Sequence, residues 1–263
     1  MLRINTLKQA LREGRPAFGL FCSTPAPQVV ERIGCAGFDF VILDTEHTLV
    51  NPETLEEMLR AAEAAGLIAL VRVPQHAPGA VLRALDAGAL GVVVPRVCSA
   101  AEAETAVRAS RYHPEGERGL NAGRAAGYGK IDLFSYLQQA NAEVMVVVMI
   151  EDRQGILEAG KILSVPGIDM VLEGAADLSQ SLGLPWQTRH PAVREALCDL
   201  QTAAQRQGVP FCAVPRVAED FGFWWGRGVR AHILGEERGI AYRALAAHLQ
   251  RFKTELKERK EGP

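Results

Sequence analysis

The sequence lacks a long apolar segment and lacks any concentration of charge of one sign. Its 263 residues carry a formal net charge of −2, and lysine and arginine are spread along the chain rather than gathered in a stripe. A nucleic acid or an anionic membrane as partner would require such a stripe. The N-terminal stretch MLRINTLKQALREGRPAFGL has no apolar core of signal-peptide length, and no later run approaches the roughly 20 apolar residues of a membrane helix. We therefore expect a cytoplasmic protein that acts on small molecules.

Cysteine and nucleotide-binding motifs are also sparse. The five cysteines are scattered, odd in number and form no CxxC pair, so they indicate neither a disulfide framework nor a zinc knuckle. The chain has no G-x-G-x-x-G fingerprint and no P-loop. This argues against a doubly wound sheet that binds nucleotides.

Short apolar runs are abundant. Eight of them recur with amphipathic segments of helical spacing between them: AFGLF (17–21), FDFVIL (38–43), IALVRV (68–73), GVVVP (91–95), VMVVVMI (144–150), IDMVL (168–172), VPFCAV (209–214) and VRAHIL (229–234). Continuous apolar runs of this length suit strands that are buried on both faces of a parallel sheet. Eight strand-plus-helix units predict an α/β fold, a (β/α)₈ TIM barrel. We expect residues 1–263 to form one domain with a charged helical tail from about residue 251 to 263.

Ionisable residues follow most of these runs. The catalytic groups of such a barrel lie at the carboxyl ends of its strands. The residues at those positions are Asp44, Glu46 and His47 after the second run, Arg72 in the third, Arg96 after the fourth, Glu151 after the fifth, Glu173 after the sixth, and Glu236 and Glu237 after the eighth. We therefore expect charged groups from at least five strand ends to converge on one mouth.

Two acids in this set are candidates for a metal site. Glu151 directly follows a buried run, where a carboxylate requires a cation or several hydrogen bonds. Asp177, one turn beyond the sixth run, is placed to face the same mouth, and two carboxylates with water and substrate oxygens suit Mg²⁺ or Mn²⁺. The alternatives are a rim salt bridge of Glu151 with Arg72 or Arg153, and an ordinary first-turn carboxylate for Asp177. The backbone N–H groups of the small residues 174–176 are candidates to hold a substrate carboxylate.

Three further positions are candidates for proton transfer or charge stabilisation. His47 lies three residues after Asp44, which is close enough to orient an imidazole. Arg72 interrupts a run that otherwise favours burial, so it should meet an anion or a developing oxyanion, or else pair with Glu46 or Glu151. Asp86 closes a helix just before Gly88, and a capping or loop role is as well supported there as a catalytic one.

The chain resembles the HpcH/HpaI class II aldolase family. The motifs that carry the resemblance occur in matching order over nearly the whole chain: FDFVILDTEHT, LVRVP, LDAGALGVVVPRV, RYHPEGERGL, MIEDRQG and VPGIDMVLEGAADLS. The resemblance implies a barrel of the phosphoenolpyruvate/pyruvate-binding type, a homo-oligomer with sites near subunit contacts, and a divalent metal that binds a 2-oxo acid. Carried over by position, it implies Glu151 and Asp177 as metal ligands, Arg72 as the group that polarises the carbonyl, His47 as the acid/base oriented by Asp44, and Asp86 as an accessory aspartate.

The sequence departs from the usual aldolase pattern at three places. It has Met149 where the family typically has Gln, Glu173-Gly174-Ala175-Ala176-Asp177 where an apolar residue and Gly-Pro-Ala-Asp are typical, and LGEERG at the end of the eighth run. Together with PFCAVPR, these features look most like the siderophore-pathway citrate synthases of staphyloferrin B-type biosynthesis. We assign Glu173, Gly174, Ala175 and Ala176, with Arg72, to substrate binding.

This narrower resemblance implies condensation of acetyl-CoA, the co-substrate, with oxaloacetate. His47 is the first candidate for the base that takes the thioester proton and Glu151 the second, and the metal is then optional. The alternative is a divalent-metal-dependent aldolase, or an oxaloacetate decarboxylase, that acts on pyruvate-type 2-oxo acids. A binding barrel without turnover is a third hypothesis, and the joint presence of Asp44, His47, Arg72 and Glu151 argues against it.

Overall fold

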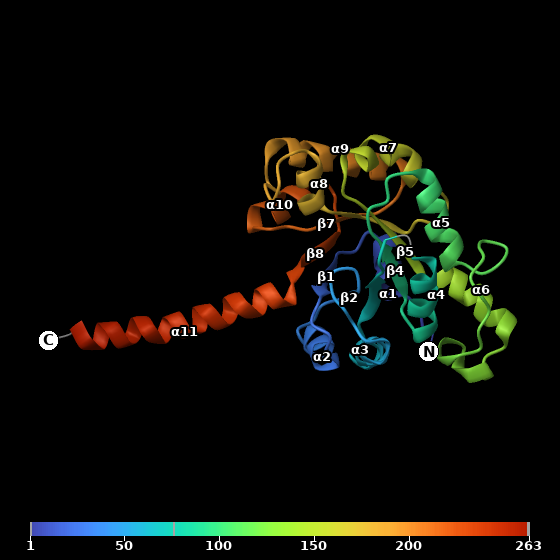
Figure 1. The fold of residues 1–263 in the computed structure, drawn as a ribbon, viewed down its shortest axis with the longest axis horizontal. Helices are drawn as coiled ribbons and strands as arrows, with labels where there is room; N and C mark the ends of the chain where they lie inside the picture. Colours follow the sequence, from blue (N-terminus) through green and yellow to red (C-terminus); the bar gives the residue numbers. More distant parts are fainter. Residues whose placement is uncertain (1, 76, 262–263) are drawn as a thin grey trace.

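Eight parallel strands close into a barrel in which each strand pairs with its neighbours in chain order (Figure 1). The computed structural model describes residues 2–75 and 77–261. The strands are β1 (Ala17–Cys22), β2 (Phe40–Asp44), β3 (Ile68–Arg72), β4 (Gly91–Val94), β5 (Met145–Ile150), β6 (Met170–Glu173), β7 (Phe211–Ala213) and β8 (Ala231–Glu236). All eight fall on the predicted apolar runs, and the predicted (β/α)₈ barrel is confirmed.

Helices cover the outside of the barrel and alternate with the strands along the chain. They are α1 (Thr6–Arg12), α2 (Pro27–Cys35), α3 (Pro52–Ala64), α4 (Pro78–Ala87), α5 (Ala100–Ser110), the 3₁₀ helix η1 (Arg124–Gly129), α6 (Leu133–Glu143), α7 (Arg153–Leu163), α8 (Ala175–Ser181), α9 (Pro191–Gln207), α10 (Ala218–Gly226) and α11 (Glu237–Glu261). Side-chain caps begin several of them; for example, Ser99 accepts a hydrogen bond from the Glu102 amide at the start of α5.

The continuous apolar character of the strands follows from burial on both faces. In β2, Phe40 and Ile42 belong to the cluster that fills the barrel, whereas Val41 and Leu43 pack outward against the helices. Successive side chains of a strand point to opposite faces, so a strand buried on both faces has no polar alternation. Leu7 of α1 joins the interior cluster. The site must therefore be sought at the carboxyl ends of the strands.

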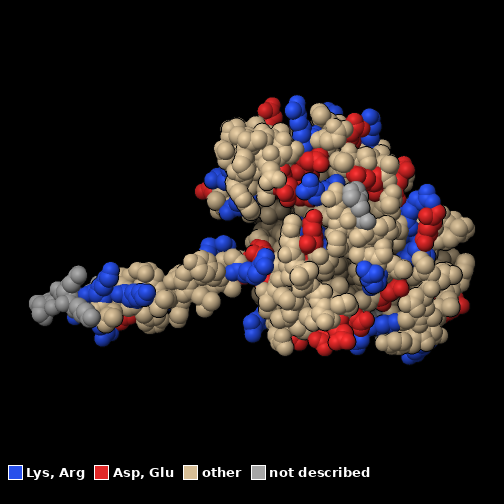
Figure 2. Space-filling view, in the orientation of Figure 1, with Lys and Arg blue, Asp and Glu red and all other residues tan. Residues whose placement is uncertain are grey.

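The last helix departs from the pattern of the others. The 25 residues of α11 project away from the barrel (Figure 1), and Figure 2 shows an uncharged stretch along the middle of this helix. The predicted tail from about 251 is the outer part of this continuous helix, and its last two residues lie outside the described residues. Among its charged residues, this helix carries large apolar side chains that are more than half exposed: Tyr242, Leu245, Leu249, Phe252 and Leu256.

Within the described part of the chain, no helix has the length and apolar character needed to span a membrane.

Candidate active site

Arg72 is fixed at the mouth by the carboxylate of the neighbouring strand. The register pairs Asp44, the last residue of β2, with Arg72, the last residue of β3. The guanidinium donates from Nε to Asp44 Oδ1 at 2.9 Å, and Nη2 lies 2.8 Å from Asp44 Oδ2. Nη1 lies 3.4 Å from Glu46 Oε2, and the ring of Phe21 lies under the guanidinium carbon at 4.8 Å. The arginine is thus oriented before any substrate binds.

Asp44 serves this arginine rather than the imidazole of His47. Burial pushes the pKa of Asp44 upward, but the hydrogen bonds and charge of Arg72 outweigh burial, so the pKa lies below its ordinary value. Asp44 Oδ1 also accepts from the backbone amides of Glu46 and His47. The His47 imidazole is 62% exposed, and its Nε2 lies 3.8 Å from Glu46 Oε2. The prediction that Asp44 orients His47 is therefore corrected: Asp44 holds the backbone of the turn, because both of its oxygens already face Arg72.

Glu151 is a buried carboxyl at the end of β5. Its Oε1 accepts a hydrogen bond of 2.8 Å from the backbone amide of Arg96, a residue held at a positive φ of 54°. Burial raises the pKa of Glu151 to about 7, and the nearby carboxylates of Asp177 and Glu46 add to this effect. The contact is with a backbone amide, rather than the rim salt bridge with Arg72 or Arg153 that was the alternative.

Glu151 and Asp177 share a pocket with both His47 and Arg72. This pocket, of about 470 Å³, lies at the carboxyl ends of the strands and includes the start of α8, where Asp177 occupies the first turn. A buried carboxyl with a raised pKa beside a second carboxylate fits a hard divalent cation, because such a cation would compensate both charges. Among residues 2–75 and 77–261, no three His, Cys, Asp or Glu side chains are grouped so as to hold a metal. A metal on these two acids would therefore need further oxygens from substrate or water.

Glu173 has a different role from the predicted one. Its carboxylate, 0% exposed, accepts from the backbone amides of Val214 and Ala175 at 2.9 and 3.0 Å. It also accepts from Arg216 at 3.0 and 3.3 Å. Both of its oxygens therefore accept hydrogen bonds within the protein, and Glu173 is not free to bind substrate. The Ala175 amide donates to Glu173, so of the backbone N–H groups of residues 174–176 that were predicted to hold a substrate carboxylate, this one is already used.

Arg216 is a residue of this pocket that the sequence reasoning missed. The signal was present, because Arg216 follows the seventh apolar run as Pro215-Arg216, in the same way that Pro95-Arg96 follows the fourth.

Asp86 is not brought to the mouth. It lies in the last turn of α4, and because each helix runs back from the mouth, that turn is at the opposite end of the barrel. Its carboxylate accepts from Arg118 at 2.8 Å and from Asn121 at 3.1 Å. Within one chain the aspartate therefore serves to fix the loop after α5.

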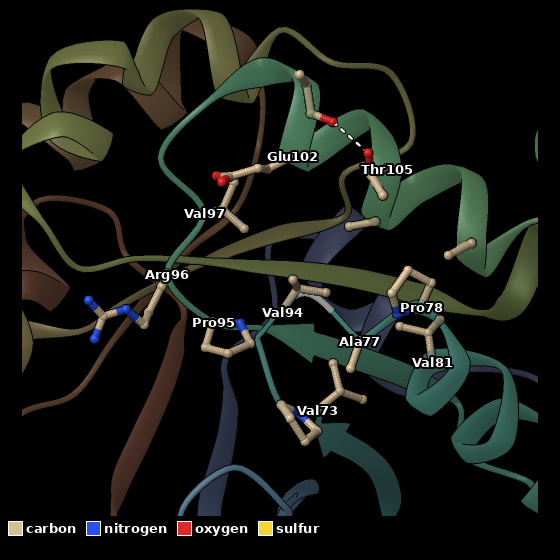
Figure 3. Close-up of a pocket in the computed structure, with 14 residues that line it drawn as sticks. Val73, Ala77, Pro78, Val81, Val94, Pro95, Arg96, Val97, Glu102 and Thr105 are labelled. Atoms are coloured by element: carbon tan, nitrogen blue, oxygen red, sulfur yellow. Dashed lines mark hydrogen bonds between the residues drawn. The ribbon is translucent and has the colours of Figure 1, made fainter.

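A separate apolar recess opens on the rim beside Arg96 (Figure 3). Its volume is about 210 Å³. Figure 3 shows Val73 and Val94 from two strand ends and Val81 of α4 around it, with Arg96 at one side. Arg96 also lines a neighbouring hollow that includes Glu151 and Asp177, and this hollow lies between the recess and the charged pocket.

A metal at Glu151 and Asp177 is expected to stabilise the folded protein. Adding Mn²⁺ to metal-stripped protein at 100 times its dissociation constant should stabilise the fold by about 2.7 kcal/mol, which would raise the thermal midpoint by several degrees. The gain should disappear in Asp177→Asn and remain in Glu57→Gln, which removes an exposed carboxylate of α3. Differential scanning calorimetry measures it, and an equal shift in Asp177→Asn would refute the site.

Comparisons with known proteins agree with the geometry. The sequence model of the HpcH/HpaI aldolase/citrate lyase family matches residues 17–239. The crystal structure of the citrate synthase SbnG superposes with a TM-score of 0.89 and 42% identity, covering 96% of this chain and 99% of that one. A hydroxypyruvate/pyruvate aldolase of Paraburkholderia phytofirmans is 39% identical over 78% of this chain and 81% of its own length. A 4-hydroxy-2-oxo-heptane-1,7-dioate aldolase of Shigella sonnei is 36% identical over 78% of this chain and 80% of its own length.

Proposed function

The chain belongs to the HpcH/HpaI aldolase/citrate lyase family, whose members form or cleave carbon–carbon bonds, and from this premise we propose that it is a citrate synthase. It condenses acetyl-CoA with oxaloacetate, and the citrate supplies siderophore biosynthesis. The observation that carries the proposal is the likeness to a solved citrate synthase over 96% of this chain at 42% identity. Because acetyl-CoA and oxaloacetate are cytoplasmic metabolites, the proposal includes a cytoplasmic location.

The residues of the pocket divide the reaction between them. A base takes a proton from the thioester methyl group, and the resulting enolate carbon attacks the carbonyl carbon of oxaloacetate. Arg72 faces the oxygen that becomes an alkoxide and stabilises its charge. His47 is the proposed base, because its exposed imidazole lines the same pocket and lies beside Glu46. The protonated base returns its proton to the alkoxide, and water then hydrolyses the thioester to release CoA and citrate.

Two further features of the site are suited to bind the proposed substrates: a pair of carboxyl groups and the apolar recess. Glu151 and Asp177 would hold the divalent metal that is typical of the family, and a bound Mg²⁺ or Mn²⁺ would polarise the 2-oxo acid as a Lewis acid. If no metal is bound, Glu151 is the second candidate for the base. The apolar recess of Figure 3 is proposed to take the apolar part of the pantetheine arm of acetyl-CoA, because Arg96 lines both this recess and the hollow that includes Glu151 and Asp177.

The direct test is to incubate the purified protein with oxaloacetate and acetyl-CoA, with and without EDTA, and to measure citrate by chromatography. A chromatographic readout avoids interference from the five cysteines. Citrate formation is the expected result. Its absence in both samples, with Mg²⁺ or Mn²⁺ restoring condensation of pyruvate with an aldehyde, would refute the proposal.

That second outcome would establish the alternative, a divalent-metal-dependent aldolase or an oxaloacetate decarboxylase. The observation that favours it is the pair of carboxylates, Glu151 and Asp177, in one pocket. The sequence relatives named as aldolases, at 36–39% identity, point in the same direction.

We also propose that the protein is a homo-oligomer that buries the apolar stripe of α11. The exposed side chains Tyr242, Leu245, Leu249, Phe252 and Leu256 recur at spacings of three and four residues. This spacing places them along one side of the helix, as in helices that pack against a partner.

Leu249→Glu is therefore expected to shift the protein to a smaller species in sedimentation velocity, because a charge would enter the buried stripe. Gln250→Glu, which adds the same charge one position away, should leave the assembly unchanged. An unaltered sedimentation coefficient in Leu249→Glu would show that the stripe is not an interface.

A further inference from the structure

Arg216 faces the candidate pocket from the wall opposite Arg72. In the closed barrel of eight strands, β3 and β7 lie four strands apart on either path around the ring. Arg72 ends β3, and Arg216 follows β7. Both side chains line the same pocket. The site therefore presents one guanidinium from each of two opposite sides.

A buried carboxylate holds Arg216 in a definite orientation. Glu173 receives Nη1 and Nη2 of Arg216 at 3.0 and 3.3 Å, and Nη1 also donates to the Val214 carbonyl at 2.7 Å. These bonds use both hydrogens of Nη1 and one of Nη2. The edge formed by Nε and Nη2 is left, and this edge carries two parallel N–H groups that match a carboxylate.

The corresponding edge of Arg72 is already engaged. Its Nε and Nη2 contact the two oxygens of Asp44. Glu46 lies 3.4 Å from Arg72 Nη1, and Glu151 and Asp177 line the pocket itself, so three carboxyl groups lie around the space that a substrate would enter. A substrate with a second carboxylate would be repelled here unless another donor received that group. The side chain of Arg216 is 28% exposed, so it is accessible from the pocket.

We propose that Arg216, positioned by Glu173, binds the second carboxylate of a dicarboxylic 2-oxo acid and so makes the site selective for four-carbon diacids over pyruvate. The inference rests on the proposed function, since it names the group that recognises oxaloacetate. The Glu173–Arg216 pair is neutral as a whole, so it contributes directed hydrogen bonds rather than net positive charge.

The test compares Arg216→Lys with the wild type. Lysine retains the charge that Glu173 requires but loses the planar fork, so the KM for oxaloacetate should rise about 10- to 100-fold, the range expected for a charge-assisted hydrogen bond. The value of kcat should change little. Arg189→Lys is the matched control, because Arg189 is half exposed and pairs with Asp220 instead. Glu173→Gln with Arg216→Gln provides a second variant in which no charge is left buried without a partner.

Binding measured by calorimetry separates this inference from the proposed function. The wild type should bind malate more tightly than lactate, and Arg216→Lys should reduce that preference by about tenfold or more while binding of lactate is unchanged. If the protein forms no citrate but shows this loss of preference, the proposed function fails and the carboxylate site stands. Equal weakening of malate and lactate, or no weakening of either, would overturn the assignment of Arg216.

Discussion

Arg72→Lys is expected to lower kcat/KM for citrate formation by about 10²- to 10³-fold, the usual cost of losing one preorganised donor to a developing oxyanion. The arginine is held by Asp44, Glu46 and the ring of Phe21, so its donors are aimed before the substrate arrives. Lysine retains a positive charge opposite the two acids but presents a single ammonium group. We therefore expect the folded structure to persist while the alkoxide loses its stabilisation.

Lysine is a better test than alanine because Asp44 is only 2% exposed. Removing the positive charge altogether would leave this carboxylate buried without a cation, which typically costs about 3–5 kcal/mol. Loss of activity in Arg72→Ala would then mix a folding defect with a catalytic one. Steady-state kinetics of Arg72→Lys, together with its thermal midpoint, separate the two effects. Activity within about threefold of the wild type would rule out Arg72 as a principal stabiliser.

The fold could be predicted because burial on both faces leaves a direct trace in the sequence. A strand such as β5, Met145–Ile150, is apolar at every position, and each of its side chains is buried. The strand ends then place Asp44, Arg72 and Glu151 by topology alone, because all parallel strands end at the same mouth. Their position at the mouth follows without knowledge of side-chain geometry.

Hydrogen-bond partners could not be predicted in the same way. The spacing of Asp44 and His47 permitted an aspartate–imidazole contact, but Arg72 on the next strand competes for the same oxygens and binds them with two donors. Glu173 similarly looked like a residue facing the substrate, and Arg216, 43 positions later, engages it instead. Asp86 belongs to the motif LDAGALGVVVPRV, which carries the family resemblance, but it lies in the last turn of α4, away from the mouth. Such choices depend on cross-strand neighbours that sequence spacing does not specify.

The apolar stripe of α11 could not be predicted for a different reason. Its lysines, arginines and glutamates predicted a solvated end, but the same helix also carries a stripe of larger apolar residues. A mean composition averages over the helix, whereas the spacing of Leu245, Leu249 and Phe252 identifies one side of it.

Gly174→Ala is expected to impair both stability and activity, because the backbone at this position adjoins Glu151. A methyl group added to Gly174 would lie 3.0 Å from the carboxyl carbon of Glu151 and still closer to its Cβ and Oε2. The backbone angles of Gly174, φ −128° and ψ 68°, do not lie in the region that favours glycine. The expected strain therefore comes from steric overlap and not from the backbone conformation. The overlap involves the Cβ of Glu151, which directly follows β5 and has little freedom to move.

Relief requires the ends of β5 and β6 to separate, and these strands are paired there through Ile150 and Glu173. Overpacking of this kind costs about 1–3 kcal/mol, and a displacement of Glu151 by about 1 Å is enough to lower kcat/KM roughly 100-fold. Gly160→Ala is the control, because nothing lies within 4 Å of the added methyl group and alanine should stabilise the interior of α7 by about 0.5–1 kcal/mol. The thermal midpoint should therefore fall in Gly174→Ala and rise in Gly160→Ala. Steady-state kinetics should show a loss of activity only in Gly174→Ala. Because the two substitutions add the same methyl group, wild-type activity in both would show that the position of Glu151 does not control the reaction.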